Sequence, residues 1–242
     1  YVSGAGQALR LYAERFVLPA QEKKKNAVNI LGVTPLDFSV NGQIQSIARR
    51  LTEGGFSVQS VWAMGSETAA IDRAGEAEVN LVVSSVGLPV AKFLRERFGM
   101  PYVVGAPLGD TVSALLLGAL QKSIHTGENE ILPAGTPDVP DTVILGESVT
   151  SRSLAAALLL DYGICAEVIC PVELPRELEG PFCRQIEDEQ ELQAALSGAR
   201  RVIADPLFAP IVPQGAQFFP LPHEAYSGRI YRKQIPNLVT TW

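Results

Sequence analysis

The apolar residues of this chain occur in short β-branched runs that alternate with longer stretches of helical period. Apolar positions 44, 47, 48 and 51, for example, follow the run 28–33 at the spacing of one helix face. The pattern predicts strands at 28–33, 56–62, 79–83 and 102–104, and helices at 44–51, 68–77, 88–98 and 111–123. Strands that alternate with helices of this length predict crossover connections and therefore a parallel sheet.

A polar stretch at 126–140, with prolines at 133, 137 and 140, separates this first set of elements from a second one. We interpret it as a domain linker. Beyond it the pattern predicts strands at 142–145, 166–169, 201–204 and 218–219, and helices from near 151 and at 189–196. We therefore expect an α/β fold with two Rossmann-like domains, each a parallel sheet flanked by helices. Their expected bounds are 27–125 and 141–242, the latter with a C-terminal tail, after a leading helix and connector at 1–26.

The charge balance narrows the possible partners. The 242 residues include 20 Lys and Arg against 26 Asp and Glu, a net charge of −6, whereas gripping nucleic acid requires a concentrated excess of basic residues. The sequence has no apolar run of about 18 residues and no secretory signal, so we expect neither a nucleic-acid nor a membrane partner and a cytoplasmic location. Three cysteines, an odd number, suit a reducing compartment. Because residue 1 is Tyr rather than Met, we also expect the sequence to be part of a longer one.

Candidate binding residues follow from the strand assignments. Open parallel sheets bind ligands beyond the carboxyl ends of their strands, and the loops at those ends in the first domain are rich in glycine and hydroxyl groups. The candidates there are Gly65, Ser84, Ser85 and Gly109. The alternative that Ser66, Ser84 or Asp110 in these loops only caps its helix stays open. In the second domain, the polar segment after the last expected strand contributes His223, Tyr226 and Ser227.

Several common catalytic signatures are missing. The first strand does not lead into G-x-G-x-x-G, and neither a phosphate-binding G-x-x-x-x-G-K-[ST] loop nor a G-x-S-x-G elbow occurs. The spacing of Cys165, Cys170 and Cys183 matches no common zinc or iron–sulfur pattern. The sequence therefore predicts no metal ligands, and its catalytic residues are not identified from motifs.

An ordered set of segments carries a family resemblance: Val28-Asn29-Ile30-Leu31-Gly32 with Pro35-Leu36-Asp37, Gly55-Phe56-Ser57-Val58, 77–84, and Phe98-Gly99-Met100-Pro101-Tyr102. Together they resemble nitrogenase component 1 and its relatives, which include cofactor-assembly scaffolds and light-independent protochlorophyllide reductase subunits. The resemblance covers about 27–110, with a weaker one from 141 to 231. Subunits of this family have three Rossmann-like domains, and this chain looks like the second and third.

The resemblance also implies partners and a cofactor. A family subunit pairs with a related subunit in a dimer or heterotetramer and receives electrons from an ATP-dependent iron–sulfur reductase. It implies an iron–sulfur cluster or metal cofactor in the full-length assembly. Ser84 stands where the nitrogenase catalytic subunit has a cofactor-ligating cysteine, and a hydroxyl is a poor substitute for a thiolate on iron. His223 precedes Tyr226-Ser227-Gly228 much as the family's second cofactor ligand precedes its Tyr-Ser-Gly.

Three functional hypotheses remain. The first is a nitrogenase component 1-like oxidoreductase subunit or fragment, which binds a metal cofactor or tetrapyrrole-like substrate in the interdomain cleft and is inactive in isolation. The second is a non-catalytic cofactor-assembly scaffold of the same fold. The third is a two-domain sugar-nucleotide enzyme, which would also bind its ligand between two Rossmann-like domains.

Overall fold

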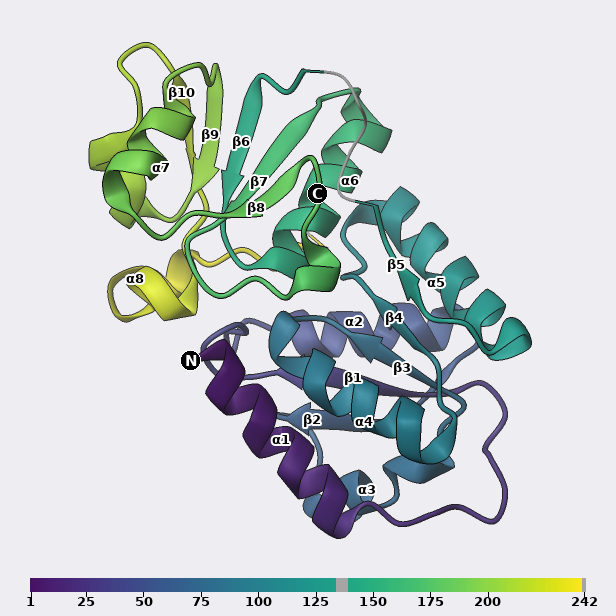
Figure 1. The fold of residues 1–242 in the computed structure, drawn as a ribbon. Coiled ribbons are helices and arrows are strands. Elements are labelled where there is room, and N and C mark those ends of the chain that lie inside the picture. The colour runs from purple at the N-terminus through teal and green to yellow at the C-terminus, as the bar shows by residue number, and fades with distance from the viewer. Residues whose placement is uncertain (134–138, 241–242) are drawn as a thin grey trace.

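Two five-stranded parallel sheets, both flanked by helices, make up the computed structural model, which describes residues 1–133 and 139–240 (Figure 1). The first sheet has the order β2-β1-β3-β4-β5 and the second the order β10-β9-β6-β7-β8. The strands of the first sheet are β1 (Ala27–Val33), β2 (Ser57–Ala63), β3 (Val79–Val82), β4 (Tyr102–Val104) and β5 (Glu130–Ile131). Those of the second are β6 (Thr142–Leu145), β7 (Ala166–Cys170), β8 (Cys183–Gln185), β9 (Arg201–Ala204) and β10 (Gln217–Pro220). The expected α/β class with two parallel sheets is confirmed.

Helices cover these sheets as the crossover connections require. The α-helices are α1 (Val2–Phe16), α2 (Gln43–Glu53), α3 (Thr68–Asp72), α4 (Leu88–Phe98), α5 (Gly109–Thr126), α6 (Ser148–Tyr162), α7 (Glu189–Leu196) and α8 (Glu224–Tyr231). The leading helix α1 packs along α4, and Gly6 allows the close approach, because a Cβ there would lie 2.8 Å from Pro89 Cγ. The first helix is therefore part of the helical layer over the first sheet.

One expected helix differs in the structure, and three elements that were not expected are present. The single helix expected at 68–77 is the short α3 followed by the 3₁₀ turn Ala74–Glu76. Strand β8 and helix α8 were not expected, because both are short and carry no apolar period. Strand β5 lies inside the expected linker and pairs with β4 through Val103 and Glu130. Pro137 lies outside the described residues, and the division of the chain at this stretch stays a prediction.

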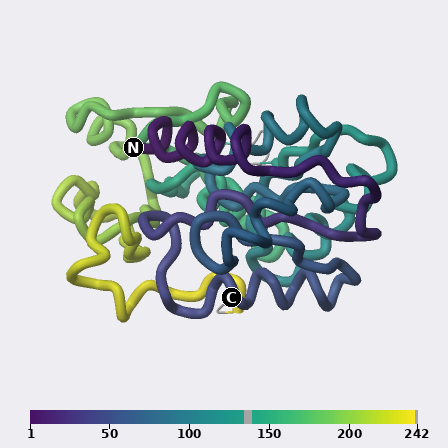
Figure 2. The backbone as a smooth tube through the Cα atoms, turned by 90° about the horizontal axis from the view of Figure 1, so that it is seen from below, coloured from purple at the N-terminus to yellow at the C-terminus, as the bar shows by residue number. Residues whose placement is uncertain are grey.

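The two sheets share one apolar core. Buried side chains run without interruption from β1 and β3 through α5 to α6 and β7, while a smaller cluster fills the space between the second sheet and α7. The tail returns to the first sheet, where Asn41 Nδ2 donates to the carbonyls of Ile235 and Pro236 at 3.2 and 3.1 Å and Val239 is fully buried. Figure 2 shows this C-terminal end against the segment near residue 45. The two halves are therefore held together at several places.

In the part of the chain that the structure describes, no helix has the length and apolar character needed to cross a lipid bilayer.

Candidate functional site

The loops that follow the strands of both sheets meet between the sheets. Ser84 and Ser85 follow β3, and Asp37 lies in the loop after β1. From the second sheet, Glu147 follows β6 and Asp205 follows β9. This arrangement fits the rule that parallel sheets carry their ligand sites at the carboxyl ends of the strands. We refer to these residues, with His223, Tyr226 and Ser227, as the interdomain cluster.

Glu147 links the two sheets. Its Oε1 accepts hydrogen bonds from the backbone N–H of Ser85, at 2.9 Å, and of Val149, at 3.1 Å. Its Oε2 accepts from the N–H of Thr150 at 2.9 Å. The carboxylate thus caps helix α6 and reaches the helical turn before α4, so that amides from two helix starts converge on one side chain. With Glu147 only 3% exposed, this is a buried charge held by backbone donors.

Asp37 lies in a chain of hydroxyl groups. Its Oδ2 accepts from Thr34 Oγ1 at 2.8 Å and from Ser84 Oγ at 2.9 Å. Thr34 in turn shares a 2.7 Å hydrogen bond with the Tyr1 hydroxyl. Gly32 makes the approach of Ser84 possible, because its φ is +93° and a Cβ there would lie 2.8 Å from Ser84 Oγ. Only glycine suits this backbone conformation and this spacing.

The pKa of Asp37 is raised from its ordinary value to about 7. Burial is the main cause and the nearby charge of Glu147 adds to it, against the lowering effect of the Thr34 and Ser84 hydrogen bonds. The geometry is consistent with a protonated carboxyl group. Ser84 has one hydroxyl hydrogen but two acceptors in range, Asp37 and the Gly32 carbonyl at 2.7 Å. If Asp37 carries a proton, it donates to Ser84 and Ser84 donates to Gly32, so each hydrogen has one acceptor.

Asp205 holds the segment that contains His223. This carboxylate, 1% exposed, accepts from the backbone N–H of His223 at 2.8 Å, from Ser227 Oγ at 2.6 Å and from the N–H of Leu207 at 2.9 Å. His223 is the N-cap of α8, where its Nδ1 accepts from the N–H of Ala225 at 3.2 Å. The segment expected to be loop-like is therefore a short capped helix tied to the end of β9.

His223 and Tyr226 form an aromatic pair within the cluster. Their ring centroids are 5.3 Å apart, and Phe208 packs on Tyr226 at 5.4 Å. Burial lowers the pKa of His223 despite the charges of Glu147, Asp205 and Glu224, so the ring is neutral near pH 7 with its proton on Nε2. Burial also raises the pKa of Tyr226, which keeps its hydroxyl protonated; Glu147 and Asp37 contribute to this shift and so lie nearby.

A cavity of about 370 Å³ lies between the two halves, next to the cluster. It is within the size range of small-molecule sites. Its walls come from the start of α1, the start of α4, the loop after β7, and β8; they include Ser85, Leu88, Lys92, Glu173, Leu174 and Glu177. The Ser85 hydroxyl is buried and has no hydrogen-bond partner among the described residues, although Ser85 lines this cavity.

The structure brings five of the seven predicted residues together and leaves two apart. Ser84 and Ser85 join the cluster through Asp37 and Glu147, and His223, Tyr226 and Ser227 through Asp205. Gly65 follows β2 with a φ of +126°, and a Cβ there would lie 3.0 Å from Val61 Cγ1. Gly109 begins α5, where its carbonyl accepts from the Ser113 hydroxyl. The role of these two glycines in ligand binding stays a prediction. Ser84 is at the N-cap position of the 3₁₀ turn Ser85–Gly87, but its side chain makes no capping hydrogen bond there and instead contacts Gly32 and Asp37, so the capping alternative is wrong for its hydroxyl.

The side chains present do not fit a thiolate-ligated metal cofactor at Ser84. The Ser84 hydroxyl is fully buried and engaged with Gly32 and Asp37, and His223 Nδ1 is used to cap α8. Within residues 1–133 and 139–240, no three His, Cys, Asp or Glu side chains are arranged to hold a metal ion. The Ser84 hydroxyl and His223 Nδ1 are therefore already used in hydrogen bonds within the protein.

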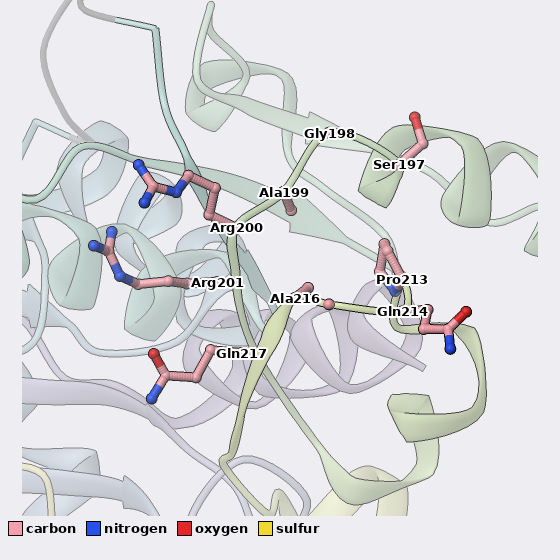
Figure 3. A pocket seen from close by; sticks show the side chains of 10 residues that line it. Ser197, Gly198, Ala199, Arg200, Arg201, Pro213, Gln214, Ala216 and Gln217 are labelled. Atoms are coloured by element: carbon pink, nitrogen blue, oxygen red, sulfur yellow. The ribbon is translucent and has the colours of Figure 1, made fainter.

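A larger hollow of about 470 Å³ lies at the opposite, amino ends of β9 and β10 (Figure 3). Figure 3 shows Arg200, Arg201 and Gln217 extending to one side, away from Ser197 and Gln214. Both arginines pair with Asp141, at 3.9 and 2.8 Å. Because its cations are already paired and its position is opposite the ligand-binding ends of the strands, we do not assign the site there.

The sequence is similar to a known protein family. The sequence model described as Nitrogenase component 1 type Oxidoreductase matches residues 1–144. A subunit of the light-independent protochlorophyllide reductase of Synechococcus sp. is 31% identical over 124 residues, which are 49% of this chain and 24% of that protein. The corresponding protein of Picosynechococcus sp. is 31% identical over 180 residues, or 69% of this chain and 35% of that protein.

The fold has a solved counterpart. The structure described as Nitrogenase Cp1 at pH 6.5 has a TM-score of 0.58 and 14% sequence identity, and the match covers 98% of this chain and 64% of that one. At this identity the match speaks for the fold alone. The matched segments cover only about a quarter to a third of the two curated relatives.

Proposed function

Since the chain belongs to the nitrogenase component 1 type oxidoreductase family, we propose that it is the ligand-binding part of a reductase subunit. In this proposal it works in the cytoplasm with a related subunit and receives electrons from an ATP-dependent iron–sulfur reductase. The substrate is a tetrapyrrole-like conjugated molecule, a class suggested by relatives named protochlorophyllide reductase. The substrate binds in the cavity between the sheets, beside the interdomain cluster.

The observation that carries this proposal is the carboxyl group of Asp37, whose pKa is raised to about 7 and which is hydrogen-bonded to Ser84, the neighbour of the cavity-lining Ser85. A group with this pKa exchanges a proton readily at neutral pH, as a general acid must. Reduction of one C=C bond consumes two electrons and two protons. The reductase supplies the electrons, Asp37 gives one proton to a substrate carbon, and solvent gives the other. Solvent then reprotonates Asp37 through the hydroxyls of Thr34 and Tyr1.

The neighbours of Asp37 would keep this proton available. Glu147 disfavours the charged form of Asp37, and Ser84 orients its carboxyl group by a hydrogen bond. Two further groups keep a hydrogen near pH 7. They are the Tyr226 hydroxyl, whose pKa is raised, and the Nε2–H of His223, whose ring is neutral because its pKa is lowered. In this proposal, the iron–sulfur cluster or metal cofactor belongs to the full-length assembly and not to donors in the interdomain cluster.

Reconstitution tests this function. The full-length protein would be purified without oxygen together with its related subunit and the iron–sulfur reductase, and then supplied with ATP and protochlorophyllide as the probe. We expect ATP hydrolysis that depends on the probe and a change in its absorption spectrum. Asp37→Asn should lower turnover by about 100-fold or more, whereas Asp110→Asn, a change at an exposed carboxylate on α5, should not. If the probe binds but is never reduced, the result favours the assembly scaffold. If the probe neither binds nor is reduced, the proposal is refuted.

A further inference from the structure

Glu147 occupies a place that would otherwise suit an anionic ligand. Backbone N–H groups at helix starts form ready anion sites. Here the N–H groups of Val149 and Thr150 at the start of α6 converge with that of Ser85, which begins the 3₁₀ turn before α4 in the other half of the molecule. All three point at the Glu147 carboxylate, which is 3% exposed. The protein thus fills its own anion site with a side chain.

The Ser85 hydroxyl is the open polar group next to this filled site. Its backbone N–H is used by Glu147, but its Oγ is buried, lacks a partner among the described residues and belongs to a residue that lines the 370 Å³ cavity. An unpaired buried hydroxyl costs free energy, so a ligand that bonds to it gains by relieving this cost. The nearby negative charge of Glu147 favours a ligand that gives a hydrogen bond to Oγ over one that brings an anion.

The other charged residues of the cavity wall also disfavour an anionic ligand. Glu173 and Glu177 both line it, and its one cation among the described lining residues, Lys92, is paired with Glu177. The remaining wall is largely apolar, with Val2, Leu88, Pro89, Leu174 and Pro175. A ligand that fits these surfaces has an apolar body and a donor group, and carries no anion where it meets Ser85.

We propose that Glu147 is a specificity-determining residue, which makes the cavity accept apolar ligands with a neutral donor or cationic group at Ser85 and reject ligands that present an anion there. This deepens the proposed function, and it rests on that function only for the idea that the ligand is a substrate. A tetrapyrrole-like substrate would then place a ring N–H edge, and not a carboxylate substituent, against Ser85.

Binding of simple ions to the full chain tests this inference without the reductase or turnover. Sulfate is the anionic probe and n-butylammonium the apolar cationic one, each titrated by calorimetry and by the NMR shift of the Ser85 amide. We expect the wild-type protein to bind n-butylammonium at least about tenfold more tightly than sulfate. Glu147→Ala should reverse this preference by freeing three N–H donors, and Glu147→Gln should weaken it while keeping the side-chain shape.

Asp188→Ala is the matched control. Asp188 caps α7 in the same half of the molecule by accepting from the N–H groups of Gln190 and Glu191, but it is exposed and lies outside the cavity. The variant frees a helix start in the same way and should leave the Ser85 response unchanged. Sulfate binding at Ser85 in the wild type that equals that of Glu147→Ala would overturn the inference, and so would unchanged preference in a folded Glu147→Gln. Because neither result involves electron transfer, failure here is distinct from failure of the proposed reductase activity.

Discussion

The backbone N–H of Ser85 donates a 2.9 Å hydrogen bond to Glu147, and this contact joins the end of β3 in one sheet to the end of β6 in the other. Ser85 is separated from Glu147 by 62 positions, so no local sequence pattern predicts their contact. The bond ties the two sheets together beside the cavity, which Ser85 lines. It also places a fixed negative charge near Asp37, which contributes to the raised pKa of that carboxyl group.

Replacement of Asp37 by Asn should change how stability depends on pH. With its pKa raised from 3.8 to about 7, Asp37 binds a proton in the folded protein that it releases in the unfolded chain between these values. The contribution of this proton to the stability of the folded protein is therefore fully present below about pH 4 and is lost as pH rises through about 7. From pH 5 to pH 8, the free energy of unfolding of the wild type, measured with urea, should fall by on the order of 2 kcal/mol more than that of Asp37→Asn. Parallel pH dependence of the two proteins would contradict this.

Gly32→Ala should disrupt the contact between Ser84 and Asp37. The new Cβ would lie 2.8 Å from both the Ser84 carbonyl and its hydroxyl, at a backbone φ of +93°. We expect a loss of about 2–4 kcal/mol in the free energy of unfolding. Gly99→Ala is the control, since Gly99 also has a positive φ, +67°, but open space around it; it should cost about 1 kcal/mol. Equal losses of stability in Gly32→Ala and Gly99→Ala would contradict this, because they would show that the positive φ alone, and not the close approach of Ser84, causes the loss.

Asp205→Ala should release helix α8 and with it His223. The change removes the acceptor for the N–H groups of Leu207 and His223 and for the Ser227 hydroxyl. Leaving such donors unpaired in the interior costs about 2–4 kcal/mol. Hydrogen exchange should speed up in α8 well before the strands of the second sheet are affected. If the α8 amides exchange as in the wild type, Asp205 does not hold the segment.

The architecture could be predicted because its signals are local. Alternation of apolar runs and helical stripes located eight of the ten described strands, including β1 and β9, and the parallel arrangement follows from the crossovers. The missed β8 has only three residues, two of them polar and exposed, and its place depends on pairing with β7. The pairing of β5 with β4 is likewise a tertiary contact with no apolar run behind it.

The site could be predicted only in part. Ser84, Ser85 and His223 follow from strand ends and from the family resemblance, and the structure places them in one cluster. Asp37, Glu147 and Asp205 were not predicted as site residues. Glu147 and Asp205 also follow strand ends, so the same rule applied to the second sheet would have found them. Asp37 lies in the loop after β1, so the rule also points to its loop, but its raised pKa depends on burial and on Glu147 from the other half.

The titration of Asp37 itself tests the central claim most directly. Its side-chain carboxyl ¹³C shift, followed by NMR in the full chain from pH 3 to pH 9 and assigned with Asp37→Asn, gives the pKa of this group alone. We predict a midpoint of about 7, with a downward shift in Glu147→Gln. A midpoint near the ordinary value of 3.8 in the folded wild-type protein would contradict the role of Asp37 as the proton donor of this site.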